Sequence, residues 1–169
     1  MHWKVDPADI APLLPNGLTL DVINNEAWVS VVGFTVKKMR PRFMPPLPYV
    51  SDFHEINLRT YVTKDGIPGI YFISIEASKA QSVFLAKYFV GLKYKKAKIK
   101  RSMGRYTLHK SREDNYFNAK YVPLHDISTK AAIDRWLTER YCAYEEINNV
   151  LYRFNIHHAE WPLKQIKIK

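Results

Sequence analysis

Lysines are dense in one stretch, GLKYKKAKIK (91–100), which contains five of them around one tyrosine. A lysine amine attacks a carbonyl compound to form an imine only when it is neutral, and burial among apolar groups lowers its pKa toward that state. If the stretch is a strand, Lys95 shares a face with Ala97 and Ile99. We predict this face to be the inner one and Lys95 to be a candidate catalytic amine. The alternative is that Lys93 and Lys95 extend their charged ends to solvent at the rim of a pocket.

A second set of polar side chains alternates along FHEINLRTY (53–61). Residues two apart in a strand share one face. The side chains on the polar face are Glu55, Asn57, Arg59 and Tyr61. On this face Glu55 is a candidate general acid or base, and Arg59 is a candidate anchor for an anionic substrate through bidentate hydrogen bonds. Asn57 and Tyr61 are predicted to line the same substrate site.

The same charged residues also fit a purely structural role. In this alternative Glu55 and Arg59 pair with partners such as Arg140 and Glu139, which lie in LTERY (137–141), and the pairs brace the fold. A charged pair inside a barrel serves either purpose, so the two readings carry equal weight at this stage.

Glu76 ends an apolar run, IYFISIEA (70–77). Its position in a strand places it on the same face as Phe72 and Ser74. We include Glu76 as a candidate substrate-binding carboxylate, beside the alternative that it is a solvated residue at the end of a strand.

The sequence offers little for a metal or an organic cofactor. His157 and His158 are adjacent, so their side chains diverge in a strand, and no third ligand stands at a spacing typical of zinc sites. Glycine-rich phosphate loops, the GxSxG elbow and dinucleotide-binding fingerprints are absent from the sequence. We therefore predict neither a metal site nor a cofactor.

Charge and hydropathy restrict the partners. The chain has 169 residues and a formal net charge of +10, and its basic residues concentrate in 37–42 and 93–105. Recognised nucleic-acid motifs are absent, so we interpret both segments as solvated and a nucleic acid as an unlikely partner. No apolar run reaches the roughly 20 residues that span a bilayer, so no membrane contact is predicted. The first ten residues lack the apolar core of a signal peptide, and we predict a cytoplasmic protein.

Turn and breaker residues divide the chain into many short strands and few helices. Helices are expected over 6–17, 78–91 and 129–139, and a proline-rich loop over 37–50. Strands are expected in a hairpin over 18–34, at 52–63 and 70–77 around a turn containing Asp65, Gly66, Pro68 and Gly69, at 94–100, 105–111 and 115–122, and in a hairpin turning at Asn148 and Asn149. This pattern is typical of an α+β protein with two or three short helices and a mostly antiparallel sheet curled into a barrel. The length predicts a single domain, 1–169.

Four segments carry a family resemblance. FHEINLRTYV (53–62), GIYFISIEA (69–77), LTERYCAY (137–144) and HAEWPL (158–163) together resemble the uncharacterised YqjF-like family, in order and across nearly the whole chain. Members of that family usually carry further residues before the HWKV segment. The chain therefore looks short at its N-terminus relative to the family.

The YqjF-like family is similar in turn to the acetoacetate decarboxylase-like superfamily. That similarity implies a barrel of mixed strands around a pocket. Decarboxylases of the superfamily begin with an LLPxxL segment, which 13–18 matches, and carry a glutamate in an early strand, which Glu55 matches. Their Phe-Pro-Lys-Lys run supplies a Schiff-base lysine, and 94–96 resembles it in part, without the proline. The resemblance implies Lys95 as the imine-forming residue.

Two functions follow from these observations. The first is a Schiff-base lyase or decarboxylase that acts on a small keto acid, with Lys95 as the amine, Glu55 as acid or base and Arg59 as anchor. The second is a non-catalytic ligand-binding or accessory protein whose pocket holds a small, anionic carbonyl compound without chemistry. Enzyme and binding protein both stay open on the sequence alone.

Overall fold

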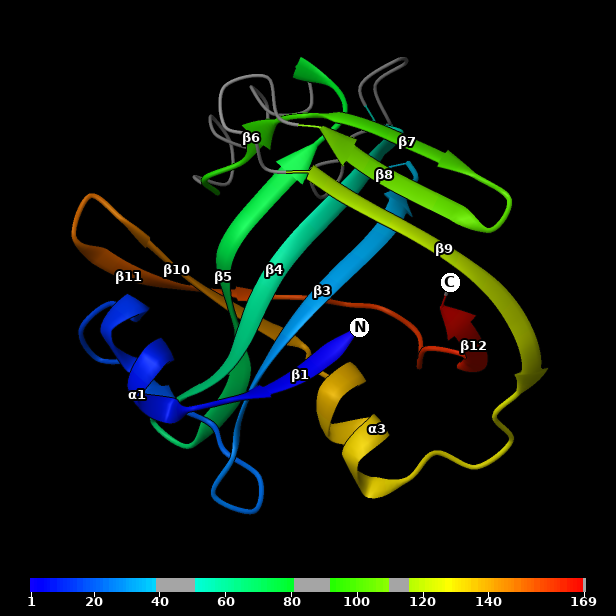
Figure 1. The fold of residues 1–169 in the computed structure, drawn as a ribbon. Coiled ribbons are helices and arrows are strands. Elements are labelled where there is room, and N and C mark those ends of the chain that lie inside the picture. The colour runs from blue at the N-terminus through cyan, green and yellow to red at the C-terminus, as the bar shows by residue number, and fades with distance from the viewer. Residues whose placement is uncertain (39–50, 81–91, 110–115, 169) are drawn as a thin grey trace. The chain divides into compact units, whose positions relative to one another are not determined.

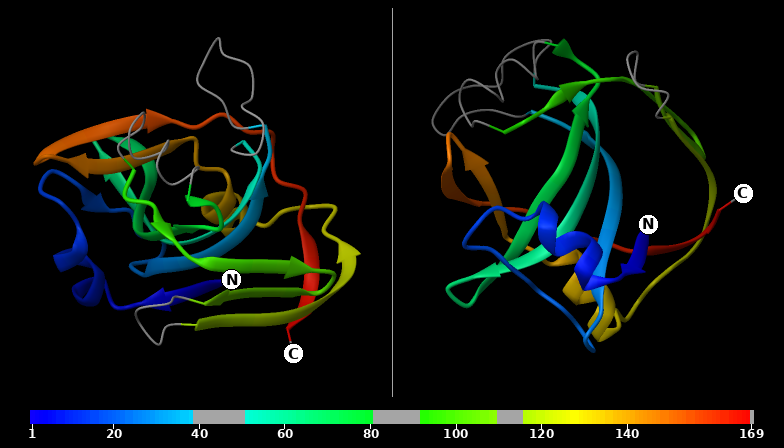
Figure 2. Two further views of the ribbon diagram at one scale, coloured as in Figure 1. Left: turned by 90° about the horizontal axis from the view of Figure 1, so that it is seen from above. Right: turned by 60° about the vertical axis from the view of Figure 1, so that its left-hand side comes forward.

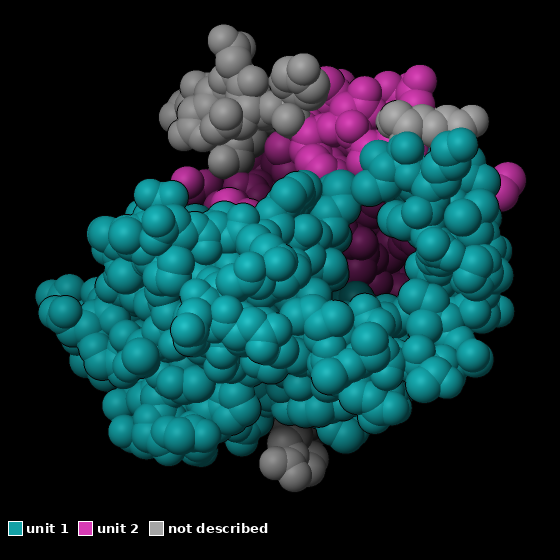
Figure 3. Space-filling model, turned by 60° about the horizontal axis from the view of Figure 1, so that its bottom comes forward, with its two compact units in different colours: residues 1–30, 59–73, 121–169 teal, residues 31–58, 74–120 magenta. Residues whose placement is uncertain are grey.

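The chain forms two compact units, which are coloured separately in Figure 3. The structure is a computed structural model that describes residues 1–38, 51–80, 92–109 and 116–168. Unit 1 consists of residues 1–30, 59–73 and 121–169, and unit 2 consists of residues 31–58 and 74–120. Each unit is described by itself, and the prediction of a single domain over 1–169 stays a prediction.

The described strands belong to two sheets (Figure 1). The strands are β1 His2–Val5, β2 Thr19–Leu20, β3 Ala27–Val36, β4 Phe53–Lys64, β5 Ile67–Ala77, β6 Lys95–Lys96, β7 Lys98–Ser102, β8 Arg105–His109, β9 Tyr116–Asp126, β10 Cys142–Ile147, β11 Val150–Asn155 and β12 Lys164–Ile168. One sheet has the order β1-β3-β4-β5-β10-β11, with β2 paired to β4 and β6 to β5, and the other has the order β12-β9-β8-β7. Over the residues that the structure describes neither sheet closes on itself, so the barrel is not confirmed.

Short helices accompany the sheets, as the α+β prediction requires. They are α1 Pro7–Ile10, the 3-10 helix η1 Ala11–Leu13 and α3 Ala132–Thr138. The Asp6 side chain caps α1 by accepting a hydrogen bond from the Ala8 backbone N–H at 2.9 Å. The helical segment ends at Leu13 because Leu14 precedes Pro15, which favours an extended conformation at Leu14, and Pro15 is one of the two stops, with Gly17, that the sequence predicts for this helix. No helix in the described ranges is long and apolar enough to cross a membrane.

Unit 1 contains the hairpin β10–β11, visible in both views of Figure 2. Its turn residues Asn148 and Asn149 have φ of 52° and 62°, the left-handed conformation that asparagine tolerates and that a two-residue hairpin turn needs. The turn predicted at these two residues is confirmed. Beside the hairpin, α3 supplies Leu137 to an apolar core that includes Tyr61 and Ile70.

In unit 2, β7, β8 and the first half of β9 pair as antiparallel neighbours. Alternate side chains of β7 and β8 pack inward, and the buried ones are Ile99, Tyr106 and Leu108. They contact Ile56 of β4 and Ala97. The opposite face of the hairpin is polar and mostly exposed.

The strands predicted at 52–63 and 70–77 are confirmed as β4 and β5, with one correction at the turn. Asp65 and Gly66 alone form the turn, with φ of 51° and 74°. Pro68 and Gly69 already belong to β5. A two-residue turn with two positive φ angles suffices to reverse an antiparallel pair, so the strand resumes earlier than predicted.

The single strand predicted at 94–100 is also wrong, because two strands of different sheets replace it. β6 pairs in parallel with β5, whereas β7 pairs with β8. Ala97 separates them and donates its backbone N–H to the Ala77 carbonyl at 3.0 Å. Three other predictions lie largely or wholly outside the described residues: the loop over 37–50, the helix over 78–91 and the turn at 112–115.

Candidate functional site

A buried carboxylate in unit 2 is the centre of the candidate site. Strand β4 places Glu55 and Asn57 two residues apart, so their side chains share one face. Glu55 is 3% exposed and accepts two side-chain hydrogen bonds. The Asn57 Nδ2 group donates to Oε1 at 2.8 Å, and the Tyr94 hydroxyl donates to Oε2 at 2.6 Å. We call these three residues the Glu55 cluster.

Tyr94 is the residue in this cluster that the sequence prediction missed. Its ring is buried and meets the Phe53 ring edge to face at 6.3 Å. Burial, and then the charge and hydrogen bond of Glu55, raise the pKa of Tyr94 above its usual value. The phenol therefore remains a donor to Glu55 throughout the physiological pH range. An aromatic residue directly before two lysines was the available signal, since of the three it is the residue most readily buried.

Asn57 gives the cluster an unused hydrogen-bonding atom. The side chain is 1% exposed, and its Oδ1 atom has no partner among the described residues. A buried acceptor without a partner is costly, and a bound molecule or an ordered water commonly satisfies it. The Glu55 cluster thus combines a carboxylate that accepts from Asn57 and Tyr94 with a buried acceptor that has no partner among the described residues.

Lys95 does not point inward as predicted. The side chains of Lys95 and Lys96 are both exposed, whereas Tyr94 and Ala97 on either side are buried. The regular alternation fails because the chain leaves the edge of β5 and enters the other sheet within these residues. The inward-facing residue of the Tyr-Lys-Lys run is therefore Tyr94.

Glu76 is buried rather than solvated. It is 3% exposed near the end of β5, and the Ser74 hydroxyl donates to its Oε2 atom at 3.5 Å. The sequence predicts that Ser74 and Glu76 share one face of the strand, and this contact is consistent with that prediction. In the parallel pairing, the backbone position opposite Glu76 is Lys95.

Arg59 and Tyr61, the other two predicted substrate-binding residues, belong to unit 1. Both are buried, and both donate to one acceptor at the end of α3: the carbonyl of Leu137 lies 3.1 Å from Arg59 Nη2 and 3.0 Å from the Tyr61 hydroxyl. The Tyr61 hydroxyl also lies 2.7 Å from the hydroxyl of Ser30. These contacts hold both side chains in place beside the helix.

Arg140 and Glu139, the residues proposed as braces, form ion pairs within unit 1. Arg140 Nη1 donates to Asp21 at 2.5 Å, and its guanidinium lies over the Trp136 ring at 4.4 Å. Glu139 accepts a hydrogen bond from Lys130 at 2.7 Å. Their ion-pair partners are thus Asp21 and Lys130 and not Glu55 and Arg59, which the bracing alternative had paired with them.

No group of three or more metal-ligating side chains occurs within the described ranges.

Comparison with protein families identifies the chain. The model of the DUF2071 family, whose members are described as uncharacterised conserved proteins, matches residues 1–169. The chain belongs to the DUF2071 family. It is 38% identical to the uncharacterised protein YqjF of Bacillus subtilis (strain 168), over 96% of this chain and 70% of that protein. The predicted YqjF-like resemblance is confirmed.

Solved structures place this DUF2071 chain in a known fold. The enduracididine biosynthesis enzyme MppR, complexed with the condensation product of pyruvate and imidazole 4-carboxaldehyde, matches 86% of the chain at a TM-score of 0.60 and 12% identity. Acetoacetate decarboxylase from Legionella pneumophila matches 99% of the chain at a TM-score of 0.54 and 15% identity. The chain spans 59% of the first protein and 60% of the second. The acetoacetate decarboxylase-like fold is thereby confirmed.

Proposed function

We propose that this protein binds a small keto acid or related carbonyl compound non-covalently, with the Glu55 cluster as the polar part of its site. One observation carries the proposal: Tyr94 is buried against Glu55, and Lys95 beside it is exposed. The proposed site lies wholly within unit 2.

The exposure of Lys95 argues against an imine at this residue. An amine that forms an imine near neutral pH has to be desolvated, because burial is what disfavours its charged form. An exposed side chain lacks that burial. Binding without covalent chemistry requires no neutral amine and is compatible with the observed position of Lys95.

The chemistry of the cluster indicates what the ligand carries. MppR, which shares the fold, has been solved with a product formed from pyruvate, and this supports a small carbonyl compound as the ligand class. The free Oδ1 atom of Asn57 is suited to a ligand hydroxyl, an amino group or a water bound with the ligand. The anchoring role predicted for Arg59, which belongs to unit 1, is not part of this proposal.

A Schiff-base lyase is the second candidate function. The Tyr-Lys-Lys run at 94–96 and the fold shared with acetoacetate decarboxylase support it. In this function Lys95 forms the imine, and Glu55 transfers the proton. Rotation of the Lys95 side chain into the pocket on substrate binding is then required.

One experiment separates the two functions. The protein is titrated calorimetrically with pyruvate and a panel of 2- and 3-keto acids, and parallel samples are reduced with borohydride and weighed by intact-mass spectrometry. We expect saturable binding, no adduct on Lys95, and unchanged affinity in Lys95→Ala and in the matched exposed control Lys96→Ala. We expect Asn57→Ala to weaken binding about tenfold, as loss of a buried hydrogen bond does.

Two results contradict the proposal. A stoichiometric adduct on Lys95 that Lys95→Ala abolishes and Lys96→Ala retains establishes the lyase instead. Folded protein that binds no member of the panel contradicts a keto-acid site altogether.

A further inference from the structure

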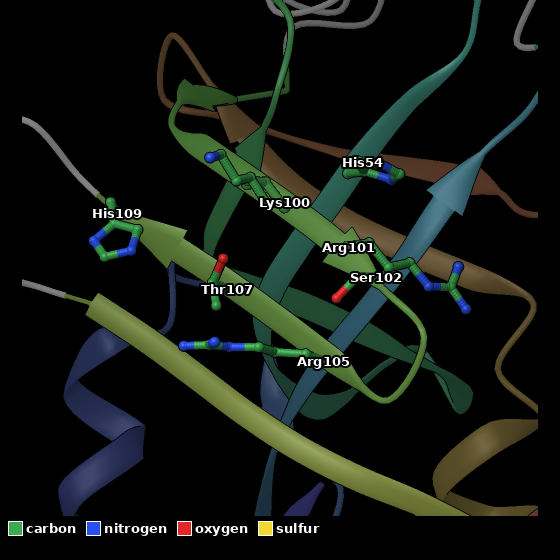
Figure 4. A pocket seen from close by; sticks show the side chains of 8 residues that line it. His54, Lys100, Arg101, Ser102, Arg105, Thr107 and His109 are labelled. Carbon is green, nitrogen blue, oxygen red and sulfur yellow. The ribbon is translucent and has the colours of Figure 1, made fainter.

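A strongly basic pocket lies in unit 2, on residues that the Glu55 cluster does not include. It has a volume of about 620 Å³ and is lined largely by the hairpin β7–β8 (Figure 4). Three of the lining residues are cations, Lys100, Arg101 and Arg105, and two are histidines, His54 and His109. None of the eight lining residues is acidic. A volume of this size is within the range of sites for small molecules.

Hydroxyl groups alternate with the cations along the hairpin. In the register of β7 and β8, Lys100 stands opposite Thr107, and Ser102 stands opposite Arg105. Opposite residues of an antiparallel pair place their side chains on the same face, so each pair offers one cation and one hydroxyl. Ammonium and guanidinium groups form strong, charge-assisted hydrogen bonds to phosphate oxygens, and hydroxyl groups add neutral donors.

The two guanidinium groups are oriented by neutral partners. Arg105 Nε donates to Asn118 Oδ1 at 3.2 Å, and Arg101 Nη1 donates to the Thr35 hydroxyl at 3.0 Å. Each contact holds a guanidinium in place without neutralising its charge. The charge of Arg105 is therefore set in position on the face that carries Lys100 and is still available to an anion, whereas Arg101, opposite Tyr106, lines the pocket from the other face of the hairpin.

Neighbouring residues add to the positive potential. Lys98 stands opposite His109 on the hairpin, and Lys120 of β9 stands opposite Arg105. Burial, followed by the charges of Arg101 and Lys79, lowers the pKa of His54. Unit 2 as a whole has 16 Lys and Arg and 5 Asp and Glu, a net charge of +11.

We propose that this pocket binds a small phosphate ester or diphosphate. The cations and hydroxyls of the hairpin bind its phosphate oxygens, and Arg105 and Lys100 supply the principal charged contacts. A concave site of this volume suits a small molecule, whereas a single-stranded nucleic acid is typically bound along an extended basic groove with stacking aromatic side chains. The site rests on residues outside the Glu55 cluster, so it stands independently of the proposed keto-acid function.

Inorganic pyrophosphate is the probe for the first test, by isothermal titration at low salt on the full chain. We expect one saturable site, with affinity reduced about tenfold in Arg105→Ala and in Lys100→Ala, the usual loss of a charge-assisted hydrogen bond. Lys167→Ala is the matched control, because it removes one positive charge from an exposed position in unit 1. Circular dichroism verifies that each variant is folded. We expect folding to be retained because Lys100 and Arg105 are exposed positions of the hairpin.

Several outcomes overturn the proposal. Folded protein that shows no saturable pyrophosphate binding contradicts the site. Equal weakening by Lys167→Ala and Arg105→Ala indicates a diffuse field instead of a pocket, and citrate binding as tight as pyrophosphate contradicts a phosphate-selective site. A short DNA duplex that binds more tightly than pyrophosphate would identify a nucleic-acid surface instead, if Lys98→Ala and Lys120→Ala weaken its binding as much as Arg105→Ala does. We expect Arg105→Ala to bind keto acids as the wild type does. This measurement separates a failure of the phosphate site from a failure of the proposed keto-acid function.

Discussion

The two units differ in how they compensate charge. Unit 1 has 10 Lys and Arg and 11 Asp and Glu, a net charge of −1, whereas unit 2 carries a net charge of +11. Two cations with buried side chains in unit 1 meet carboxylates: Arg140 meets Asp21 and Lys130 meets Glu139. In the basic pocket of unit 2, Arg101 and Arg105 are held by a hydroxyl and an amide.

This difference separates charges that stabilise the fold from charges that can bind a ligand. A cation paired with a carboxylate is already satisfied and has little capacity to bind another anion. Cations gathered without a carboxylate repel one another, and an anionic ligand relieves that repulsion. We therefore expect substitutions of charged residues to change stability in unit 1 and ligand affinity in unit 2. Three predictions concern stability. The first compares backbone packing in the two units, and the other two test the charge pairs of unit 1.

The largest effect is expected from Gly69→Ala in unit 1. An added Cβ would lie 2.8 Å from the Tyr144 ring and 2.9 Å from the Cys142 carbonyl, and a backbone carbonyl moves only with its strand. We expect a loss of about 3 kcal/mol in the free energy of unfolding, measured by urea denaturation.

Gly33→Ala in unit 2 is the control for this substitution. Its added Cβ meets the Tyr106 ring at 3.4 Å, an ordinary contact, so we expect a change below about 1 kcal/mol. Equal losses in the two variants would contradict the close approach at Gly69.

A smaller loss is expected from breaking the pair between Arg140 and Asp21. The side chains are 5% and 18% exposed, so Asp21→Ala leaves a nearly buried guanidinium without its carboxylate. We expect a loss of about 2 kcal/mol in unfolding free energy. The exposed pair Lys4–Glu26 provides the comparison, since Glu26→Ala is expected to cost less than about 1 kcal/mol. A negligible effect of Asp21→Ala would show that burial does not strengthen this pair.

The smallest effect is expected from acid titration of Glu139. Burial raises the pKa of this carboxyl, but hydrogen bonds from Lys130, Tyr141 and Thr138 outweigh it and lower the pKa to about 2. A carboxyl with a lowered folded-state pKa stabilises the fold above its unfolded pKa, and this stabilisation is lost as the pH falls toward 2. We expect wild-type stability to fall from about pH 4.5 downward, and to fall less steeply in Glu139→Gln. Parallel pH profiles of the two proteins would refute the assignment.

Local sequence signals predicted the elements well. The long strands β4 and β5 follow from runs of β-branched and aromatic residues. The turns at Asp65–Gly66 and Asn148–Asn149 follow from residue types that tolerate positive φ. These features depend on neighbours in the chain, which is why the sequence alone suffices for them.

The candidate site was predicted less completely. Glu55 and Asn57 were placed on one face correctly, because period-two alternation holds along an uninterrupted strand. Their partner Tyr94 was missed, and Lys95 was assigned its place, because the alternation was extended across a point where the chain changes sheets. The basic residues near 100–105 were interpreted as solvated, since the sequence does not show that His54 and the hairpin line one pocket.

The sequence by itself determined the α+β class, the principal turns and the family, since these depend on composition, short-range pattern and conserved order of segments. Only the tertiary structure decided that Tyr94 instead of Lys95 contacts Glu55, and that Lys100, Arg101 and Arg105 line a pocket whose described lining residues include no carboxylate. The physical reason is that strand pairing sets which side chains meet across a sheet. Pairing joins residues far apart in the chain, and local periodicity carries no information about it.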